Sequence, residues 1–120
     1  MSKSAISLFV FSIYLYLMGL VLVVAPNTLL RVFRVPETDE VWIRVVGMLV
    51  IILGFYYSHA ARAGLTQFFA WTVIARSAVL LFFIAFVLAD FAAPILILFG
   101  VIDFAAAMWT LIALRSERAS

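Results

Sequence analysis

The sequence has no cysteine and a single histidine, His59, among its 120 residues. The lack of cysteine excludes disulfide bonds, thiol nucleophiles and cysteine-ligated zinc or iron–sulfur sites. A single histidine also excludes a bis-histidine haem or a multi-histidine metal site within one chain. We therefore expect no metal site and no bound cofactor.

Charge is scarce as well: charged residues make up 12% of the chain, whereas hydrophobic residues make up 68%. Ordinary soluble domains are about 45–50% apolar and about 25% charged. A soluble domain of this length cannot bury so much apolar surface, because small domains have a high ratio of surface to volume. The composition excludes a soluble globule and a disordered tail. The scattered basic residues do not form a nucleic-acid-binding patch, and the expected partner is the lipid bilayer.

The few charges delimit four apolar runs. Residues 5–25 and 45–61 carry no charge, and the runs 63–89 and 91–114 are each interrupted once. A helix that crosses the hydrocarbon core needs roughly 20 residues, and a backbone in lipid must form its hydrogen bonds internally. We predict transmembrane helices near 5–25, 41–63, 66–88 and 91–114, in one domain covering 1–120. Short connections predict an all-α, integral membrane, up-down-up-down four-helix bundle.

The longest connection, residues 27–40, follows Pro26, which ends the first helix because proline has no amide donor. Leucines and valines alternate there with Arg31 and Arg34, so the segment is either a short helix on the lipid head groups or a plain loop. The first helix is expected to be retained and not cleaved as a signal peptide, since its apolar stretch is long and Pro26 is a poor cleavage context.

The basic residues also predict an orientation. With four spans both chain ends lie on one side, and that side has one more Lys or Arg than the other. The two sets are Lys3, Arg62, Arg115 and Arg118 against Arg31, Arg34 and Arg44. Basic residues favour the cytoplasmic side, which predicts cytoplasmic termini in a bacterial inner membrane.

Two charges lie near the centres of apolar runs. Arg76 is midway between Arg62 and Asp90, and Asp103 is midway through the fourth run. Consecutive antiparallel helices bring Arg76 and Asp103 to one depth, where an unpaired charge costs roughly 2.5–3.5 kcal/mol. We predict an Arg76–Asp103 ion pair inside the bundle. The pair is either a fixed salt bridge that sets helix register or the polar centre of a proton, ion or head-group site.

Several polar and small residues accompany this pair. Three side chains near the depth of Arg76 are candidates to complete its hydrogen bonds: Ser12, Tyr14 and Thr72. Small residues, Gly19 and Gly47 among them, recur at helical spacing. Such stripes are either seams of close helix packing, the commoner case, or the walls of a cavity.

Two further clusters lie at the ends of the spans. The first consists of Tyr56, Tyr57, His59 and Arg62. These residues are either interfacial side chains reaching the head groups or a head-group or quinone site. At the opposite rim Arg44 is expected to pair with Glu40 or Asp90.

The second span carries a pattern that resembles small bacterial four-helix proteins of the BphX-like and DoxX-like type. The pattern is Trp42-x-Arg44-x-x-Gly47, then Gly54-x-Tyr56-Tyr57-x-x-Ala60-Ala61-Arg62, with Arg76, and with Asp103 followed by Trp109-Thr110. The resemblance covers nearly the whole chain. It implies a four-helix membrane bundle, sometimes associated with oxidative enzymes or quinone-linked systems, and it supplies no catalytic residue.

Two functions follow as hypotheses. The first is a non-enzymatic accessory or scaffold subunit that packs against a larger membrane protein, or a second copy, through phenylalanine-rich faces of the third and fourth spans. Those phenylalanines are Phe68, Phe69, Phe82, Phe83, Phe86, Phe91 and Phe99. The alternative is a bundle that handles a small molecule, a quinone, a lipid, protons or ions around Arg76 and Asp103. A third hypothesis is a membrane enzyme that acts on lipids or quinones through His59 and the nearby tyrosines, although we favour a protein without catalytic activity.

Overall fold

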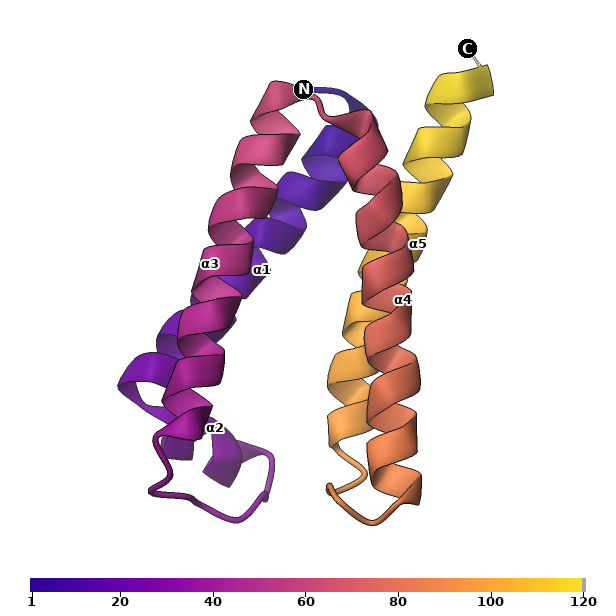
Figure 1. Ribbon diagram of the computed structural model, residues 1–120. Coiled ribbons are helices and arrows are strands. Elements are labelled where there is room, and N and C mark those ends of the chain that lie inside the picture. Colours follow the sequence, from indigo (N-terminus) through magenta and orange to yellow (C-terminus); the bar gives the residue numbers. More distant parts are fainter. Residues whose placement is uncertain (120) are drawn as a thin grey trace. The chain divides into compact units, whose positions relative to one another are not determined.

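The computed structural model describes residues 1–119, which form five helices (Figure 1). They are α1 (Lys3–Val24), α2 (Pro26–Val32), α3 (Trp42–Ala63), α4 (Thr66–Leu88) and α5 (Leu96–Ala119). No strand occurs within residues 1–119. Four of the helices, all except α2, are long and apolar enough to cross a membrane. The all-α class is confirmed, and the four apolar helices indicate an integral membrane protein.

The first three predicted spans match α1, α3 and α4 to within two residues, but the fourth does not. Helix α5 begins at Leu96 and not near residue 91, and it continues to Ala119. Pro94 is the reason, because proline disfavours helical geometry at the residue before it. The N–H of Leu96 then bonds the carbonyl of Ala93 at 3.0 Å and opens the helix. The turn expected at residues 89–90 is therefore a longer connection covering 89–95.

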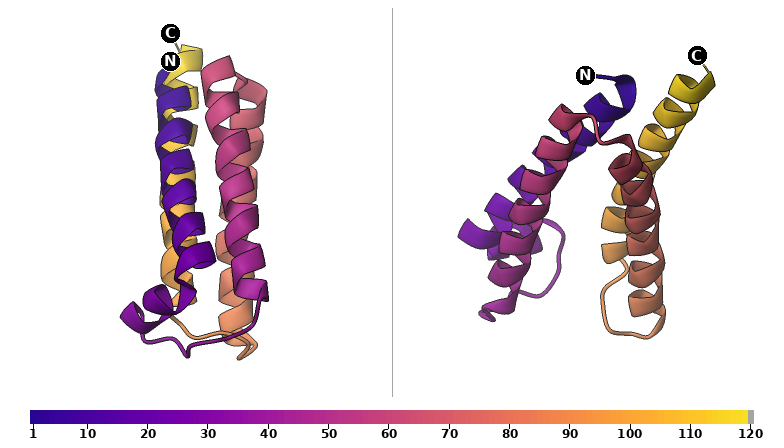
Figure 2. Two further views of the ribbon diagram at one scale, coloured as in Figure 1. Left: turned by 90° about the vertical axis from the view of Figure 1, so that its left-hand side faces the viewer. Right: turned by 45° about the horizontal axis from the view of Figure 1, so that its top comes forward.

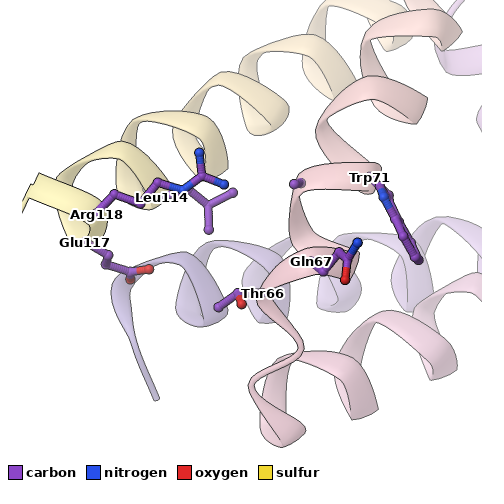
Figure 3. Close-up of a pocket in the computed structure, with 7 residues that line it drawn as sticks. Thr66, Gln67, Trp71, Leu114, Glu117 and Arg118 are labelled. Atoms are coloured by element: carbon purple, nitrogen blue, oxygen red, sulfur yellow. The ribbon is translucent and has the colours of Figure 1, made fainter.

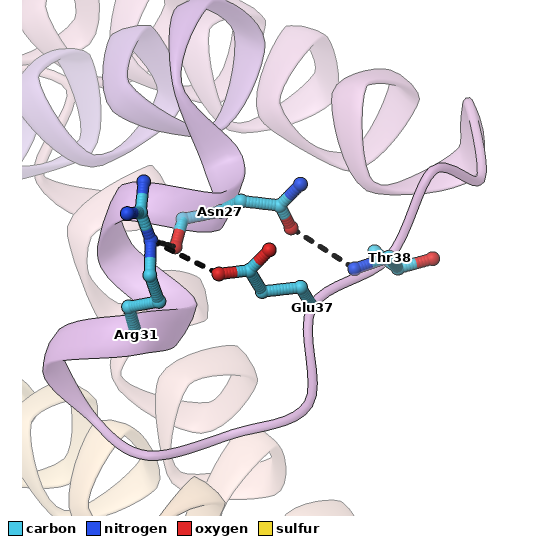
Figure 4. Close-up of polar contacts among 4 residues, drawn as sticks. All are labelled: Asn27, Arg31, Glu37 and Thr38. Carbon is cyan, nitrogen blue, oxygen red and sulfur yellow. Dashed lines mark hydrogen bonds and ion pairs between the residues drawn. The ribbon is translucent and has the colours of Figure 1, made fainter.

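Residues 26–32 adopt the helical alternative. Pro26 lies in the first turn of α2, where its missing N–H leaves no helical hydrogen bond unmade. The following loop folds back onto this helix (Figure 4): the Asn27 side-chain oxygen accepts from the N–H of Thr38 at 2.9 Å, and Arg31 Nε lies 3.0 Å from the Glu37 carboxylate. The place of α2 at the lipid head groups stays a prediction.

The chain forms two compact units. We call residues 9–59 the α1–α3 unit, and residues 1–8 together with the chain from Ala60 onward the α4–α5 unit. The first two turns of α1 therefore pack with α4 and α5. Figure 2 shows the helices from two further directions.

Helices α1 and α3 meet through two glycines. A Cβ atom added to Gly47 would lie 2.9 Å from the carbonyl oxygen of Gly19, and one added to Gly19 would lie 2.7 Å from the carbonyl oxygen of Gly47. Real side-chain atoms do not approach a backbone so closely, so only glycine fits at either position. These small residues form a seam of close helix packing, as is common between membrane helices.

Helices α4 and α5 lie side by side and run antiparallel (Figure 1). Gly100 allows their close approach, because a Cβ atom there would lie 3.1 Å from Leu80 Cα. The hairpin brings the start of α4 beside the end of α5.

We expect Gly47→Ala to destabilise the α1–α3 unit by about 1–3 kcal/mol, the usual cost of overpacking. The added methyl group meets Leu22 Cβ at 2.8 Å and the Gly19 carbonyl, and neither can retreat without moving the helix. Unfolding in detergent, followed by circular dichroism, measures the loss.

Gly64→Asn is the contrasting control. Gly64 has φ +69 and open space around it, and asparagine tolerates that left-handed backbone. We expect a loss below about 1 kcal/mol. Equal losses in the two variants would contradict the close-packing account.

Candidate functional site

Helix α4 turns one polar stripe inward. Its buried residues are Phe69, Thr72, Val73 and Arg76, which recur at the three- and four-residue spacing of one helix face. Most of the remaining residues of α4 are apolar, so the two buried polar residues, Thr72 and Arg76, mark which face of the helix is turned inward. Phe69 is fully buried, at 0% exposed. Its predicted place on an outward phenylalanine face is wrong.

Arg76, only 2% exposed, donates hydrogen bonds to two threonines. Nη2 lies 3.0 Å from Thr72 Oγ1 and 2.9 Å from Thr110 Oγ1. Nε lies 3.2 Å from the carbonyl oxygen of Thr72. The structure therefore brings one of the three proposed neighbours, Thr72, to the guanidinium and adds Thr110 from α5.

From Thr110 the hydrogen bonds continue to the start of α1. Thr110 Oγ1 and Ser7 Oγ are 2.7 Å apart, and Ser7 Oγ donates to the carbonyl oxygen of Ser4 at 2.7 Å. Thr110 Oγ1 also lies 3.3 Å from the carbonyl oxygen of Ala106 on its own helix, so its single hydroxyl hydrogen goes either to Ser7 or to Ala106.

The path ends at a carboxylate. Glu117, near the end of α5, accepts from the Ser4 N–H at 2.8 Å and from Ser4 Oγ at 2.7 Å. First-turn N–H groups have no partner within their own helix, and a negative charge is favourable at that end. Glu117 therefore caps α1. We call the set Thr72, Arg76, Thr110, Ser7, Ser4 and Glu117 the polar chain.

Asp103 lies on the same face of α5 as Thr110, two turns and about 10 Å nearer the start of the helix, and is half-buried. Helical side chains lean toward the N-terminus of their own helix. Since α4 and α5 are antiparallel, Arg76 leans toward the Thr66 end and Asp103 toward the Leu96 end. This explains why the hydrogen bonds of the guanidinium go to Thr72 and Thr110. The ion pair with Asp103 stays a prediction.

The other two proposed neighbours of Arg76 belong to the α1–α3 unit. Ser12 Oγ donates to the carbonyl oxygen of Phe9, and the ring of Tyr14 lies 5.6 Å from that of Phe11. Their approach to Arg76 stays a prediction.

The tyrosine and histidine cluster of α3 is split between surface and interior. Tyr57 is buried, whereas Tyr56 and His59 are exposed. His59 Nδ1 lies 2.9 Å from the carbonyl oxygen of Phe55, and Arg62 is exposed in the other unit. The tyrosines therefore do not share one surface, and a quinone or head-group site here stays a prediction.

Arg44 caps the C-terminal end of α1. Its Nη1 donates to the carbonyl oxygen of Val23, one of the last carbonyls of α1, which have no partner within the helix. A cation is also favoured at that end of a helix. Its predicted pairing with Glu40 or Asp90 stays a prediction.

A groove of about 580 Å³ opens where α4 begins and α5 ends (Figure 3). It is lined by Thr66, Gln67, Ala70, Trp71, Leu114, Glu117 and Arg118. We call it the rim groove. Its carboxylate is the outer end of the polar chain.

Sequence reasoning missed Ser4, Ser7 and Glu117. The signal was present in two spacings: Ser4 and Ser7 share one face of α1, and Thr110 and Glu117 are two turns apart on α5. Nothing in the sequence linked the two faces, because the residues they join are more than 100 positions apart.

No family model, curated protein or solved structure matches the chain. Within residues 1–119, no three His, Cys, Asp or Glu side chains gather closely enough to hold a metal ion. The role of these residues is therefore inferred from the geometry of the site.

A double-mutant cycle tests the predicted ion pair. We expect Arg76→Leu and Asp103→Leu each to destabilise the protein in detergent, because each leaves an opposite charge in apolar surroundings. We expect the double variant to recover about 1–3 kcal/mol relative to the sum of the two single changes. Additive losses would show that the two side chains do not interact.

Proposed function

We propose that this chain is a small integral membrane protein that acts as a non-enzymatic accessory or scaffold subunit of a membrane complex. The observation that carries the proposal is the polar chain. Its members hydrogen-bond to one another and tie the first turns of α1 to α4 and α5. The buried polar groups are thus used to hold helices in register.

The chemistry of Arg76 supports this role. A guanidinium keeps its proton under all ordinary conditions, so the inner end of the polar chain neither takes up nor releases one. Arg76 instead acts as a donor to two helices, through Thr72 on its own helix and Thr110 on α5. Such a group is better suited to fixing the rotation of two helices about their axes than to exchanging a proton with a substrate.

The outward face of α4 is the surface we propose for the partner. It exposes large apolar side chains: Trp71, Ile74, Leu81, Phe82, Phe86 and Leu88. Without a hydrophobic driving force between helices in lipid, such a face associates through shape and close packing. The proposed partner is a larger membrane protein or a second copy of this chain. The resemblance to bacterial DoxX-like and BphX-like proteins favours a bacterial inner membrane, and the excess of one Lys or Arg on the side of the chain ends favours cytoplasmic termini.

A photo-crosslinking residue at Phe82, which is 62% exposed, tests the proposal in native membranes. We expect a discrete protein adduct, because the exposed side chain at this position is available to a partner. The same residue at Phe83, which contacts the position of Gly100 within the unit, is the matched control and should react internally. If only lipid adducts form at Phe82, the scaffold proposal is contradicted.

A second candidate function is the handling of protons, ions or a small polar molecule, a quinone or a lipid. One observation favours it: hydrogen bonds run from Arg76 through Thr110 and Ser7 to the carbonyl oxygen of Ser4, and the N–H and Oγ of Ser4 bond to Glu117. Hydroxyl groups both donate and accept, so the hydroxyls of Thr110 and Ser7 are candidate members of a proton relay.

Thr110 separates the two functions. Thr110→Val removes the hydroxyl and keeps the shape, whereas Thr110→Ser keeps the hydroxyl. We expect Thr110→Val to lower stability by about 1 kcal/mol, and we expect no proton flux above that of empty vesicles for the parent protein or either variant. A flux seen with the parent and Thr110→Ser, and lost in Thr110→Val, would establish the relay instead.

A further inference from the structure

A second groove lies where α1 begins and α5 ends, and we call it the flank groove. It has a volume of about 290 Å³ and is lined by Lys3, Ile6, Trp109, Ile112, Ala113 and Ser116. That volume is just below the range of about 300–1,000 Å³ typical of small-molecule sites. The flank groove is therefore large enough for the head group of one lipid, whose acyl chains would remain in the bilayer.

The polar chain holds the two walls of the flank groove together. Ser4 of α1 bonds to Glu117 of α5. The residues that precede these two in the chain, Lys3 and Ser116, both line the groove, so they lie at the same end of it. About one turn deeper, a second hydrogen bond also joins α1 to α5. The groove is thus a fixed feature of the α4–α5 unit.

The lining of the flank groove changes from polar to apolar with depth. Lys3 is the first residue of the first apolar span, and Ser116 lies two residues before the end of the fourth, so both are near the membrane surface. Ile6 and Ile112 lie deeper, and Trp109 is about 10 Å from Ser116 along α5. Tryptophan is common at the membrane interface. This order matches a phospholipid, with its head group at the surface and its acyl chains below.

Lys3 and Ser116 supply donors for a phosphate. Both side chains are exposed, and the lysine ammonium is a compact cation with three N–H donors. Hydrogen bonds from a cation to a phosphate are roughly twice as strong as those between neutral groups. The serine hydroxyl adds a further donor, and the indole N–H of Trp109 is a donor at the level of the glycerol esters.

The charges at this end of the α4–α5 unit favour an anionic head group. Its segments 1–8, 60–66 and 107–119 contain four basic residues and one acidic residue, Glu117. The Glu117 carboxylate is held by the first residues of α1 and lines the rim groove, not the flank groove. The six lining residues of the flank groove include no carboxylate, so an ammonium or choline group would meet no opposite charge there. A head group with net negative charge would gain from the basic residues.

From this arrangement we infer that the flank groove binds the head group of an anionic glycerophospholipid, with the phosphate at Lys3 and Ser116 and the acyl chains along Ile112 and Trp109. A lipid bound there would contact α1 and α5 at once and would strengthen the junction that the polar chain forms. This inference goes beyond the scaffold role and does not depend on it.

The test uses the purified full chain in detergent with phosphatidylglycerol, phosphatidylethanolamine and phosphatidylcholine of identical acyl chains. Native mass spectrometry measures the affinity for each lipid. We expect phosphatidylglycerol to bind about tenfold more tightly than the other two, which is the size of effect that one charge-assisted hydrogen bond gives. We expect Lys3→Gln to abolish that preference, and Lys3→Arg to retain it because the charge is kept.

Arg115→Gln is the matched control. It removes one positive charge from the same end of α5, but Arg115 is outside the lining of the flank groove. Because salt screens an exposed charge that does not contact the ligand, we expect the affinity for phosphatidylglycerol to change less than about twofold.

Three results would overturn the inference. Equal affinities for the three lipids would show non-specific lipid contact. Equal losses in Lys3→Gln and Arg115→Gln would show that diffuse positive charge attracts the lipid, without a role for the groove. If soluble glycerol phosphate bound as tightly as phosphatidylglycerol, the ligand would be a free phosphate ester. None of these results bears on crosslinking at Phe82, so the two proposals fail separately.

Discussion

The desolvation of one guanidinium organises the α4–α5 unit. Arg76 is in the middle of an apolar helix and is almost fully buried, so its donors must be satisfied by protein oxygens. Thr72 supplies one hydroxyl from the same helix, and Thr110 supplies another across the helix pair. Thr110 is then held by Ser7, and Ser4 by Glu117. Of the two hydroxyls that accept from the arginine, that of Thr110 is held by Ser7, and that of Thr72 is held by the carbonyl oxygen of Phe69.

Different interactions hold the helices together in the two units: mainly close backbone packing in one, and close packing with side-chain hydrogen bonds in the other. In the α1–α3 unit, Gly19 and Gly47 remove side chains so that the backbones touch and dispersion contacts accumulate. In the α4–α5 unit, Gly100 does this locally, and hydrogen bonds between hydroxyls add specificity. Close packing fixes the distance between two helices, whereas the polar chain also fixes their rotation, because a hydrogen bond is lost after a small turn of the helix.

Much of the fold could be predicted from the positions of the charges. The limits of α1, α3 and α4 follow from where charge-free runs stop, since a buried charge is costly in lipid. The start of the fourth span was predicted too early, because the prediction used only the positions of charges. Pro94 is uncharged, but it disfavours a helical backbone at the residue before it and so delays the start of α5. Of the candidate site, the burial of Arg76 and the nearness of Thr72 could be anticipated, since Thr72 is one turn away on the same helix.

The apolar runs alone establish the class of the protein, because segments of this length must satisfy their backbone hydrogen bonds as helices. Which oxygens accept from the guanidinium depends instead on how α4 and α5 pack. The lean of side chains along antiparallel helices carries Arg76 toward Thr110, and its ion pair with Asp103 stays a prediction. The cap that Glu117 forms on α1 joins residues 113 positions apart. No local pattern encodes that contact, since it depends on how distant helices pack.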